Sequence, residues 1–343
     1  MRHLRPTTPD DLRALTAVRP GEVRIGERAG TLDEGGQAPA GARIALLGVP
    51  EDIGVRANGG RPGARRMWKA LLPRLLNMQS NAFVDGAAFM VAGRVDVRDL
   101  RGRAAAIDET AGGPVARAQA LRELRALVAE VDARVASVVA NLRGMGLVPV
   151  VVGGGHNNAY GILTGCARAA GAPLGCVNVD LHADLRPQEG RHSGNPFTYA
   201  RAEGHLARYA VAGMSERYAT QAILDALAAD PALRAFTFEG FLAGGMDVVS
   251  LADAALAHVG TGPATLELDL DAVVGAPASA AAASGFTPAQ FRALALRLAA
   301  RMDLHAVHLA EGAPDLGPWP PEMLGKLGAE LVLDVAGGIL RPR

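Results

Sequence analysis

Three apolar runs in this chain each lead directly into a short cluster of aspartate and histidine residues, and this feature constrains the fold most. The runs cover residues 147–152, 174–179 and 264–268 and have the length and composition of buried strands. In a parallel α/β sheet the carboxyl ends of the strands lie along one edge, where ligands bind. The three clusters, which are far apart in sequence, are therefore expected to meet in space.

The clusters contain four carboxylates and two imidazoles. A single aspartate after a strand can equally be a helix N-cap or a loop residue. In an Asp-x-His-x-Asp pattern, however, all three side chains share one face while the chain is extended. Carboxylates packed together resist ionisation unless cations neutralise them, so we predict a binuclear metal site. The predicted ligands are His156, Asp180, His182, Asp184, Asp269 and Asp271.

The identity of the metal is narrowed by the ligand types. An oxygen-rich set with only two imidazoles favours Mn²⁺ over Zn²⁺, and ligand type alone leaves Ni²⁺ and Co²⁺ open. The ligand types therefore favour manganese for the two divalent ions.

Composition excludes several partners. The chain has 343 residues, 49% of them apolar, and its 35 basic and 35 acidic side chains give zero net charge without a basic run, which argues against nucleic acid. No apolar stretch reaches the roughly 18 residues that span a membrane. Cys166 and Cys176 lack metal-ligand spacing and suggest a reducing compartment, and the N-terminus lacks the apolar region of a secretory signal. We expect a cytoplasmic protein that binds a small molecule.

Strand patterns alternate with helical patterns along the chain, which predicts a doubly wound parallel sheet. Residues 1–40 are expected to form an N-terminal extension that is partly mobile, and residues 41–343 a single catalytic domain. Residues 275–284 are rich in alanine, glycine and serine and are predicted to form a loop beside the last cluster. Further strands are expected at 43–49, 206–212, 235–238 and 305–309, and helices at 115–145, 219–229, 251–258 and 288–301.

Taken together, the motifs resemble the ureohydrolase family of arginase, agmatinase and formimidoylglutamase over residues 43–314. The resemblance rests on Gly-Gly-x-His at 153–156, on the Asp-x-His-x-Asp and Asp-x-Asp clusters, and on Glu311 in the segment 308–314. Within the family, the segments 58–64, 184–187 and 193–197 are most similar to formimidoylglutamase.

The resemblance implies an arginase-like, three-layer fold with a mostly parallel eight-stranded sheet. It also implies how the ligands divide between two Mn²⁺ ions, with Asp180 and Asp269 bridging: one ion would take His156, Asp180, Asp184 and Asp269, and the other His182, Asp180, Asp269 and Asp271. By the same analogy the protein would be a homo-oligomer, a trimer or a hexamer.

The chemistry expected of such a centre is hydrolysis of a C–N bond in a formimino or guanidino group. Two cations that share a water lower its pKa and hold a hydroxide, which would attack the C=N carbon. Asp184 would take the proton of the hydroxide and pass it to the leaving nitrogen. Glu311 would pair with the cationic end of the substrate.

The sequence departs from arginase at Phe197, which stands at the position of the arginase proton-shuttle histidine. Formimidoylglutamases carry Ser-Gly-x-Pro-Phe there, so the departure supports that branch. His192 could substitute as a shuttle or be merely exposed. Asn157 stands where many formimidoylglutamases have Glu, and its place beside His156 suggests a role in substrate choice or in hydrogen bonding behind the metal ligands. His308, at a position where the family often has Asp, is assigned no role.

Residues for binding the rest of the substrate are also suggested. Ser193 and Asn195 match positions that hydrogen-bond the distal end of the substrate in arginase. A formiminoglutamate substrate has an anionic tail, for which Arg61 and Arg186 are candidate partners. For Arg61, the alternative is that it ties a surface loop through backbone carbonyls.

Three functions follow. The first is hydrolysis of N-formimino-L-glutamate to L-glutamate and formamide. The second is hydrolysis of a guanidino compound with release of urea, as in arginase, agmatinase or guanidinobutyrase. The third is a metal-binding subunit without turnover.

Overall fold

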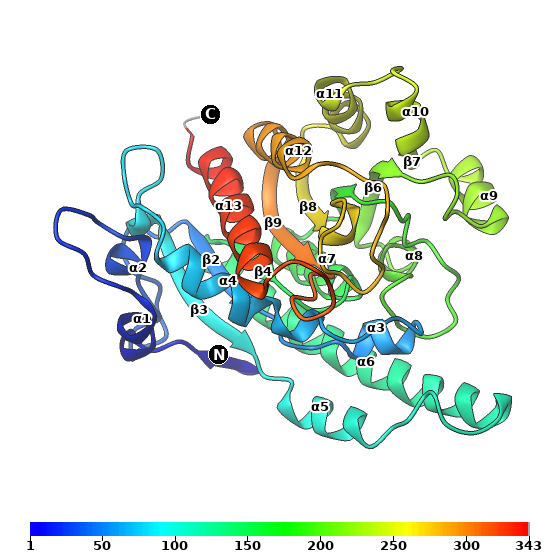
Figure 1. The fold of residues 1–343 in the computed structure, drawn as a ribbon, viewed down its shortest axis with the longest axis horizontal. Helices are drawn as coiled ribbons and strands as arrows, with labels where there is room; N and C mark the ends of the chain where they lie inside the picture. Colours follow the sequence, from blue (N-terminus) through cyan, green and yellow to red (C-terminus); the bar gives the residue numbers. More distant parts are fainter. Residues whose placement is uncertain (342–343) are drawn as a thin grey trace.

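A computed structural model, which describes residues 1–341, contains one nine-stranded sheet with helices on both faces (Figure 1). The strand order is β1-β3-β2-β4-β9-β8-β5-β6-β7, and all neighbours are parallel except β1 and β3. The strands are β1 (Leu4–Pro6), β2 (Ile44–Gly48), β3 (Phe89–Val95), β4 (Val148–Val152), β5 (Leu174–Val179), β6 (Leu206–Met214), β7 (Leu233–Thr237), β8 (Pro263–Asp269) and β9 (Asp303–Ala310).

The helices form the two outer layers. Side chains alternate between the faces of each strand, so Leu46 of β2 belongs to one apolar core and Leu47 to the other. The first core is closed by α4 (Met67–Leu76), α11 (Val248–Val259), α12 (Pro288–Arg301) and α13 (Pro321–Leu340). The second is closed by α3 (Ile53–Ala57), α5 (Arg98–Ala105), α6 (Pro114–Gly144), α7 (Asn158–Ala170), α8 (Pro196–Ala202) and α9 (Gln221–Ala229).

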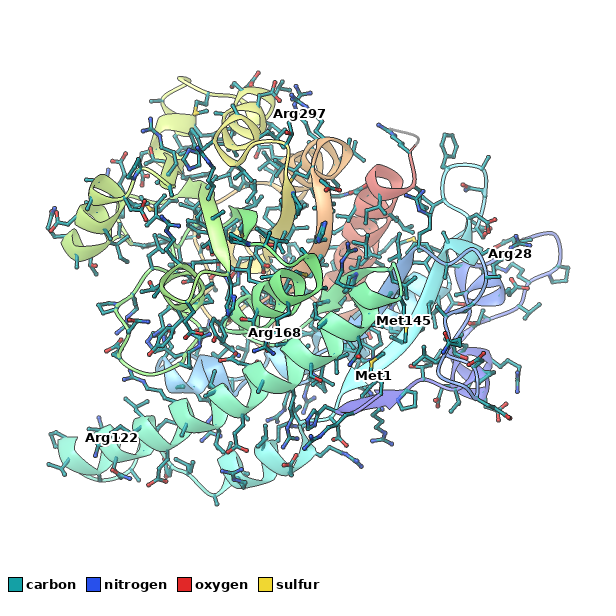
Figure 2. All side chains as sticks on the ribbon, turned by 180° about the vertical axis from the view of Figure 1, so that it is seen from behind. Met1, Arg28, Arg122, Met145, Arg168 and Arg297 are labelled. Atoms are coloured by element: carbon teal, nitrogen blue, oxygen red, sulfur yellow. The ribbon has the colours of Figure 1, made fainter. Side chains whose placement is uncertain are left out.

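The long helix α6 crosses the back of the molecule, where Arg122 marks its first half and Met145 its end (Figure 2). Its C-terminal half is buried against α7 through residues such as Val135 and Val139, while its first residues are exposed. The remaining helices are short: α1 (Pro9–Leu15), α2 (Ile25–Arg28) and α10 (Phe238–Leu242). Among residues 1–341, no helix is both long and apolar enough to cross a membrane.

The predicted fold class is confirmed, with one strand more than the eight expected. All seven strands predicted from the pattern are present, and α12 has the predicted bounds. The pattern missed β3 and β1. The three residues of β1 are too few to show a period, and they form a strand because β3 offers an open edge on which Leu4 pairs with Val95.

The first 40 residues contribute β1, α1 and α2. Thr8 and Asp11 form a capping box that starts α1. Leu12 of α1 and Ile25 of α2 are buried in the same core as α4. This segment is therefore joined to the sheet through β1 and packs on α4 through both helices.

The sheet topology brings the predicted ligands together. β4, β9, β8 and β5 are consecutive in the sheet and parallel, so their carboxyl ends lie side by side. His156 follows β4, Asp180 follows β5, Asp269 ends β8, and Glu311 follows β9. This edge of the sheet is the usual position of a ligand site in an α/β fold.

Candidate metal centre

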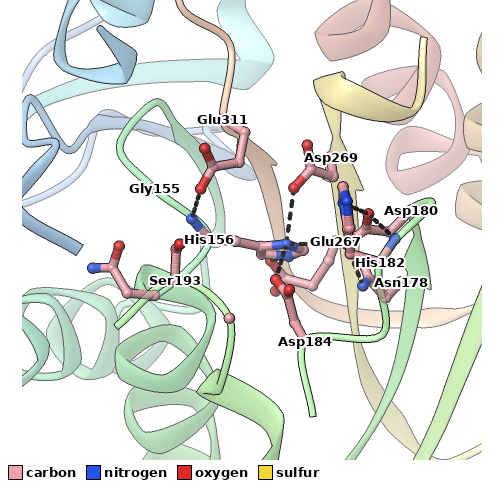
Figure 3. Close-up of polar contacts among 12 residues, drawn as sticks. Gly155, His156, Asn178, Asp180, His182, Asp184, Ser193, Glu267, Asp269 and Glu311 are labelled. Atoms are coloured by element: carbon pink, nitrogen blue, oxygen red, sulfur yellow. Dashed lines mark hydrogen bonds and ion pairs between the residues drawn. The ribbon is translucent and has the colours of Figure 1, made fainter. Parts of the chain in front are cut away.

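The imidazole of His156 lies among three carboxylates from two different strand ends (Figure 3). Its Nδ1 atom is 2.9 Å from Asp184 Oδ2, 3.0 Å from Asp269 Oδ2 and 3.3 Å from Asp180 Oδ2. One ring nitrogen carries at most one proton, so it cannot donate to all three oxygens. The arrangement suits a cation held by the four side chains.

A second group forms around His182. Its Nδ1 atom is 3.1 Å from Asp271 Oδ2 and 3.5 Å from Asp180 Oδ1. Asp180 therefore faces His156 with one oxygen and His182 with the other, which is the placement expected of a bridging ligand. Asp269 lies beside this group, because its Oδ1 accepts a hydrogen bond of 2.8 Å from the backbone N–H of Asp271.

Local hydrogen bonds fix the extended segment after β5. The backbone N–H of His182 donates to Asp180 Oδ1 at 2.7 Å. The Asn178 amide donates to Asp180 Oδ2 at 2.9 Å and to the Tyr209 hydroxyl at 3.0 Å, and that hydroxyl donates to the carbonyl of residue 183 at 2.8 Å. Side chains of β5 and β6 thus fix the position of the Asp-x-His-x-Asp triplet through hydrogen bonds.

The turn before His156 depends on glycine. Gly153 and Gly154 have φ of +85° and +76°, a region that favours glycine. A Cβ atom on Gly154 would also lie 2.2 Å from Nδ2 of Asn158. The Gly-Gly-x-His motif is therefore required by the tight turn that directs His156 into the centre.

The electrostatics of the site favour bound positive charge. Burial raises the pKa of Asp184 to about 6, and burial together with the neighbouring Asp269 raises the pKa of Asp271 well above its usual value. Burial alone would lower the pKa of His156, but Asp180, Asp184 and Asp269 raise it well above its usual value. The two imidazoles lower the pKa of Asp180 despite its burial. The surroundings thus disfavour the ionised form of Asp184 and Asp271 and stabilise a cation at the same point.

The donor set fits a pair of divalent metal ions. Both ring nitrogens of His156 and Oδ1 of Asp271 are buried without a hydrogen-bond partner. Ligand atoms of two overlapping groups each lie within 4.8 Å of one another: His156, Asp180 and Asp184, and Asp180, His182 and Asp271. Buried polar atoms without partners are uncommon in folded proteins, and metal ions would satisfy these.

A cavity of about 700 Å³ opens beside the metal ligands. Glu311 lies on its wall with φ of +60° and accepts a hydrogen bond of 2.7 Å from the backbone N–H of His156. Its other oxygen accepts from the Ser279 hydroxyl. Burial and the nearby Asp269 raise the pKa of Glu311 to about 8. The wall also includes Asn58, His182, Asp184, Arg186, Ser193, Tyr218, Asp269, Asp271 and Ser279.

Two of the predicted substrate-binding residues line this cavity. Arg186 donates to Asn58 Oδ1 at 2.7 Å and pairs with Glu189 at 2.8 Å. Ser193 accepts from the Asn58 amide at 3.2 Å. Within residues 1–341, Arg186 is the sole arginine or lysine on the wall of the cavity.

Three other predicted residues do not line the cavity. Asn157 is fully buried, and its amide donates to Glu51 at 3.3 Å. Asn195 is also fully buried and accepts from Arg191 at 2.6 Å. Arg61 donates to the backbone carbonyls of residues 278 and 279 at 3.1 Å each, as in the alternative considered for it. Their positions favour supporting roles rather than direct contact with a substrate.

The aromatic and histidine residues singled out in the sequence are buried. Phe197 packs edge-on against the His156 ring, with centroids 5.4 Å apart. His192 lies 3.1 Å from Glu189 and is not on the cavity wall, so its place does not favour a shuttle role. His308 Nδ1 lies 2.8 Å from Glu267 Oε2, and the same oxygen is 3.6 Å from His156 Nε2.

Sequence reasoning missed several residues of the site. Glu51 and Glu267 are buried next to the His156 turn and ring, and Tyr218 stacks on His182 with centroids 5.2 Å apart. Glu51 could have been found, because it follows β2 just as the ligands follow their strands. Glu267 is an acid inside an otherwise apolar strand, which is itself a signal. Ser279 lies in the predicted loop 275–284 and Asn58 opens the segment 58–64, but no pattern in the sequence singles out these two side chains. Tyr218 lies in a loop that the sequence analysis did not consider.

Comparison with known proteins agrees with this geometry. Residues 42–337 match the model of the arginase family. The chain is 32% identical over 293 residues to a formimidoylglutamase from Nocardia farcinica, covering 79% of both chains. It is 33% identical over 284 residues to a formimidoylglutamase from Chromobacterium violaceum, covering 79% of this chain and 81% of the relative.

The fold is similar to solved structures over nearly the whole chain. A Trypanosoma cruzi formiminoglutamase with Mn²⁺₂ superimposes with a TM-score of 0.73 at 20% identity, covering 94% of this chain and 100% of the other. At that identity the likeness concerns the fold.

Proposed function

Because the chain belongs to the arginase family, we propose that it hydrolyses N-formimino-L-glutamate to L-glutamate and formamide. Water adds its oxygen to the formimino carbon, the bond from that carbon to the glutamate nitrogen breaks, and the nitrogen gains a proton. The observation that carries the proposal is the cluster of five ligands, joined by Asp269 through its contact with His156, beside a cavity with one arginine on its wall. The relatives named formimidoylglutamase support the same substrate.

The metal ligands are the six strand-end residues. We assign His156, Asp180, Asp184 and Asp269 to one Mn²⁺ and His182, Asp180, Asp269 and Asp271 to the other. When bound by these residues, a pair of divalent ions would supply a hydroxide nucleophile at neutral pH. Ni²⁺ and Co²⁺ are compatible with the same ligand types.

The side chains on the cavity wall handle protons and orientation. Asp184 has a carboxyl group on the cavity wall, with its Oδ2 2.9 Å from His156 Nδ1, and we assign it the role of accepting a proton and delivering it to the leaving nitrogen. Glu311 is held by His156 and Ser279 and faces the cavity, where it would lie beside the cationic formimino group. A cation at this point lowers the pKa of the Glu311 carboxyl group, so the ionised form can orient the substrate by a charge-assisted hydrogen bond.

The anionic tail of the substrate is assigned to the part of the cavity wall around Arg186. Arg186 supplies the positive charge, and Ser193 and Asn58 supply hydrogen bonds beside it. Asn157, Asn195 and Arg61 then act behind the wall, by holding the loops that carry these groups.

A product assay tests the proposal. Mn²⁺-loaded protein is offered formiminoglutamate, arginine, agmatine, guanidinobutyrate and guanidine in parallel. Formamide and glutamate from the first compound are expected. Urea from any of the others would replace the proposal with a guanidino hydrolase. Bound Mn²⁺ without turnover of any compound would favour a non-catalytic subunit.

The assembly and location of the protein are also proposed by analogy with the family. We expect a homo-oligomer, a trimer or a hexamer, in the cytoplasm. Size-exclusion chromatography with light scattering gives the mass directly, and a monomer would contradict this expectation.

A further inference from the structure

Glu51 is a fully buried carboxylate that lies behind the His156 turn and takes no part in the proposed reaction. Its Oε1 accepts hydrogen bonds from the backbone N–H of Gly155 at 3.1 Å and from the Asn158 amide at 2.8 Å. Its Oε2 accepts from the backbone N–H groups of Ile53 at 2.7 Å and Gly54 at 3.2 Å. Each oxygen is thus bound by donors from a different segment.

Every contact of this carboxylate is with a neutral donor. The Asn157 amide adds a fifth hydrogen bond to Oε1 at 3.3 Å. Within residues 1–341, no arginine, lysine or histidine forms an ion pair with Glu51. Burying a carboxylate without a cationic partner is costly, and only a full set of hydrogen bonds offsets that cost. The group is therefore placed here as an acceptor for backbone and amide donors.

The contacts join three segments around the cavity. Residues 51–54 are bound to residues 155–158 through the carboxylate itself. The Gly54 carbonyl in turn accepts from the backbone N–H of Ser193 at 3.1 Å, which connects the loop on the cavity wall. Asn157, the residue directly after His156, also donates to Glu51, so the carboxylate holds the chain on both sides of this ligand.

We propose that Glu51 is a positioning residue of the metal centre, which fixes the Gly-rich turn so that His156 Nδ1 faces the three aspartates. The substitution Glu51→Gln tests this sharply, because it keeps the size and shape of the side chain. An amide placed here turns its NH₂ group towards N–H donors in either orientation. The turn loses part of its anchor, although no metal ligand or cavity-wall residue has changed.

The measurement is Mn²⁺ affinity by titration calorimetry on the full chain, with thermal unfolding recorded in parallel. We expect Glu51→Gln to weaken Mn²⁺ binding by about 10- to 100-fold, the usual effect of removing a partner behind a metal ligand. Asp334→Asn is the matched control: Asp334 is half-buried, pairs with Arg292 at 2.7 Å and lies on α13 away from the cavity. It should lower the unfolding temperature and leave Mn²⁺ affinity unchanged.

A second variant covers the case in which Glu51→Gln does not fold. Asn158→Ala removes one donor to Glu51 and should weaken Mn²⁺ binding several-fold in a folded protein. Wild-type Mn²⁺ affinity in the folded variant, or a loss equal to that of Asp334→Asn, would overturn the proposal.

The inference rests on the proposed function only in taking the aspartate and histidine cluster as a Mn²⁺ site. The role of Glu51 and the hydrolytic activity can therefore fail separately. Loss of Mn²⁺ in Glu51→Gln, with no hydrolysis of formiminoglutamate by the wild type, would reject the function and keep the inference. Hydrolysis of formiminoglutamate by the wild type, with normal Mn²⁺ binding in Glu51→Gln, would reject the inference and keep the function.

Discussion

Replacing Arg186 by methionine tests where the anionic end of the substrate binds. Arg186 lies on the cavity wall, and its side chain is 44% exposed. Its contacts with Asn58 and Glu189 use two N–H groups, and a guanidinium has further donors with which to grip a carboxylate. Methionine keeps much of the length and apolar surface of the side chain but removes the charge.

The size of the effect follows from the exposure of the side chain. A hydrogen bond to a charged group contributes about 1.5–3 kcal/mol when it is well formed. Because Arg186 is partly exposed and also paired with Glu189, solvent and competition place its contribution at the lower end, about 1.5 kcal/mol. This corresponds to roughly a tenfold rise in KM. kcat should change little, because the contact is made equally in the bound substrate and in the transition state.

Steady-state kinetics on two substrates provides the check. Formiminoglutamate should show the rise in KM, whereas a formimino derivative of a simple amine without carboxylates should react equally with wild type and variant. Arg66→Met serves as control, since Arg66 is an exposed residue that pairs with Asp315 and does not line the cavity. An unchanged KM for formiminoglutamate, or an equal loss on both substrates, would refute the assignment of Arg186.

Three further changes probe the centre and its supports. Asp269→Ala should abolish Mn²⁺ retention and activity together, since a ligand assigned to both ions is lost; two ions per chain with normal turnover would contradict the ligand assignment. Ser279→Ala removes the hydroxyl that donates to Glu311 and should lower kcat/KM by about tenfold, the lower end for a hydrogen bond to a charged group, with metal content by atomic absorption unchanged. Phe197→Ala should lower the free energy of unfolding in urea by about 3–5 kcal/mol, because the buried ring packs on His156. A decrease below about 1 kcal/mol would show that the ring is loosely packed.

The strand-end ligands could be predicted from sequence because two independent regularities coincide there. Apolar runs such as 174–179 mark buried parallel strands, and parallel strands bring their carboxyl ends to one edge. His156, Asp180 and Asp269 are therefore placed by the fold class alone, before any side-chain detail is known. The same reasoning, extended to β2, would have included Glu51.

The cavity wall was harder to predict, because loops place side chains without periodicity. Asn195 has the sequence context of a substrate contact, yet in the structure it is buried and accepts from Arg191 and from the backbone of His192. Conversely, Ser279 lies in an alanine-rich loop with no motif, and it reaches Glu311 because Arg61 holds the backbone beside it. Which side of a loop faces the cavity depends on such long-range contacts, and these have no local signature.

Backbone conformation gives a separate argument that Asp184 and Glu311 are the working groups of the site. Within residues 1–341, the non-glycine residues with positive φ are His3, Asp184 and Glu311, at +63°, +49° and +60°. Such a conformation costs an L-residue about 1–2 kcal/mol, and strain of this kind persists only where surrounding contacts impose it. For Glu311 these contacts are visible, because its backbone N–H donates to the Gly154 carbonyl at 3.1 Å and its carboxylate accepts from His156. Glycine at either position would relieve the strain but would remove the carboxylate. His3 lies directly before β1 and has no part in the site, but the other two are the positions where the proposed reaction needs an acidic side chain at the cavity. At these two positions the local geometry supports the proposed chemistry independently of the sequence motifs.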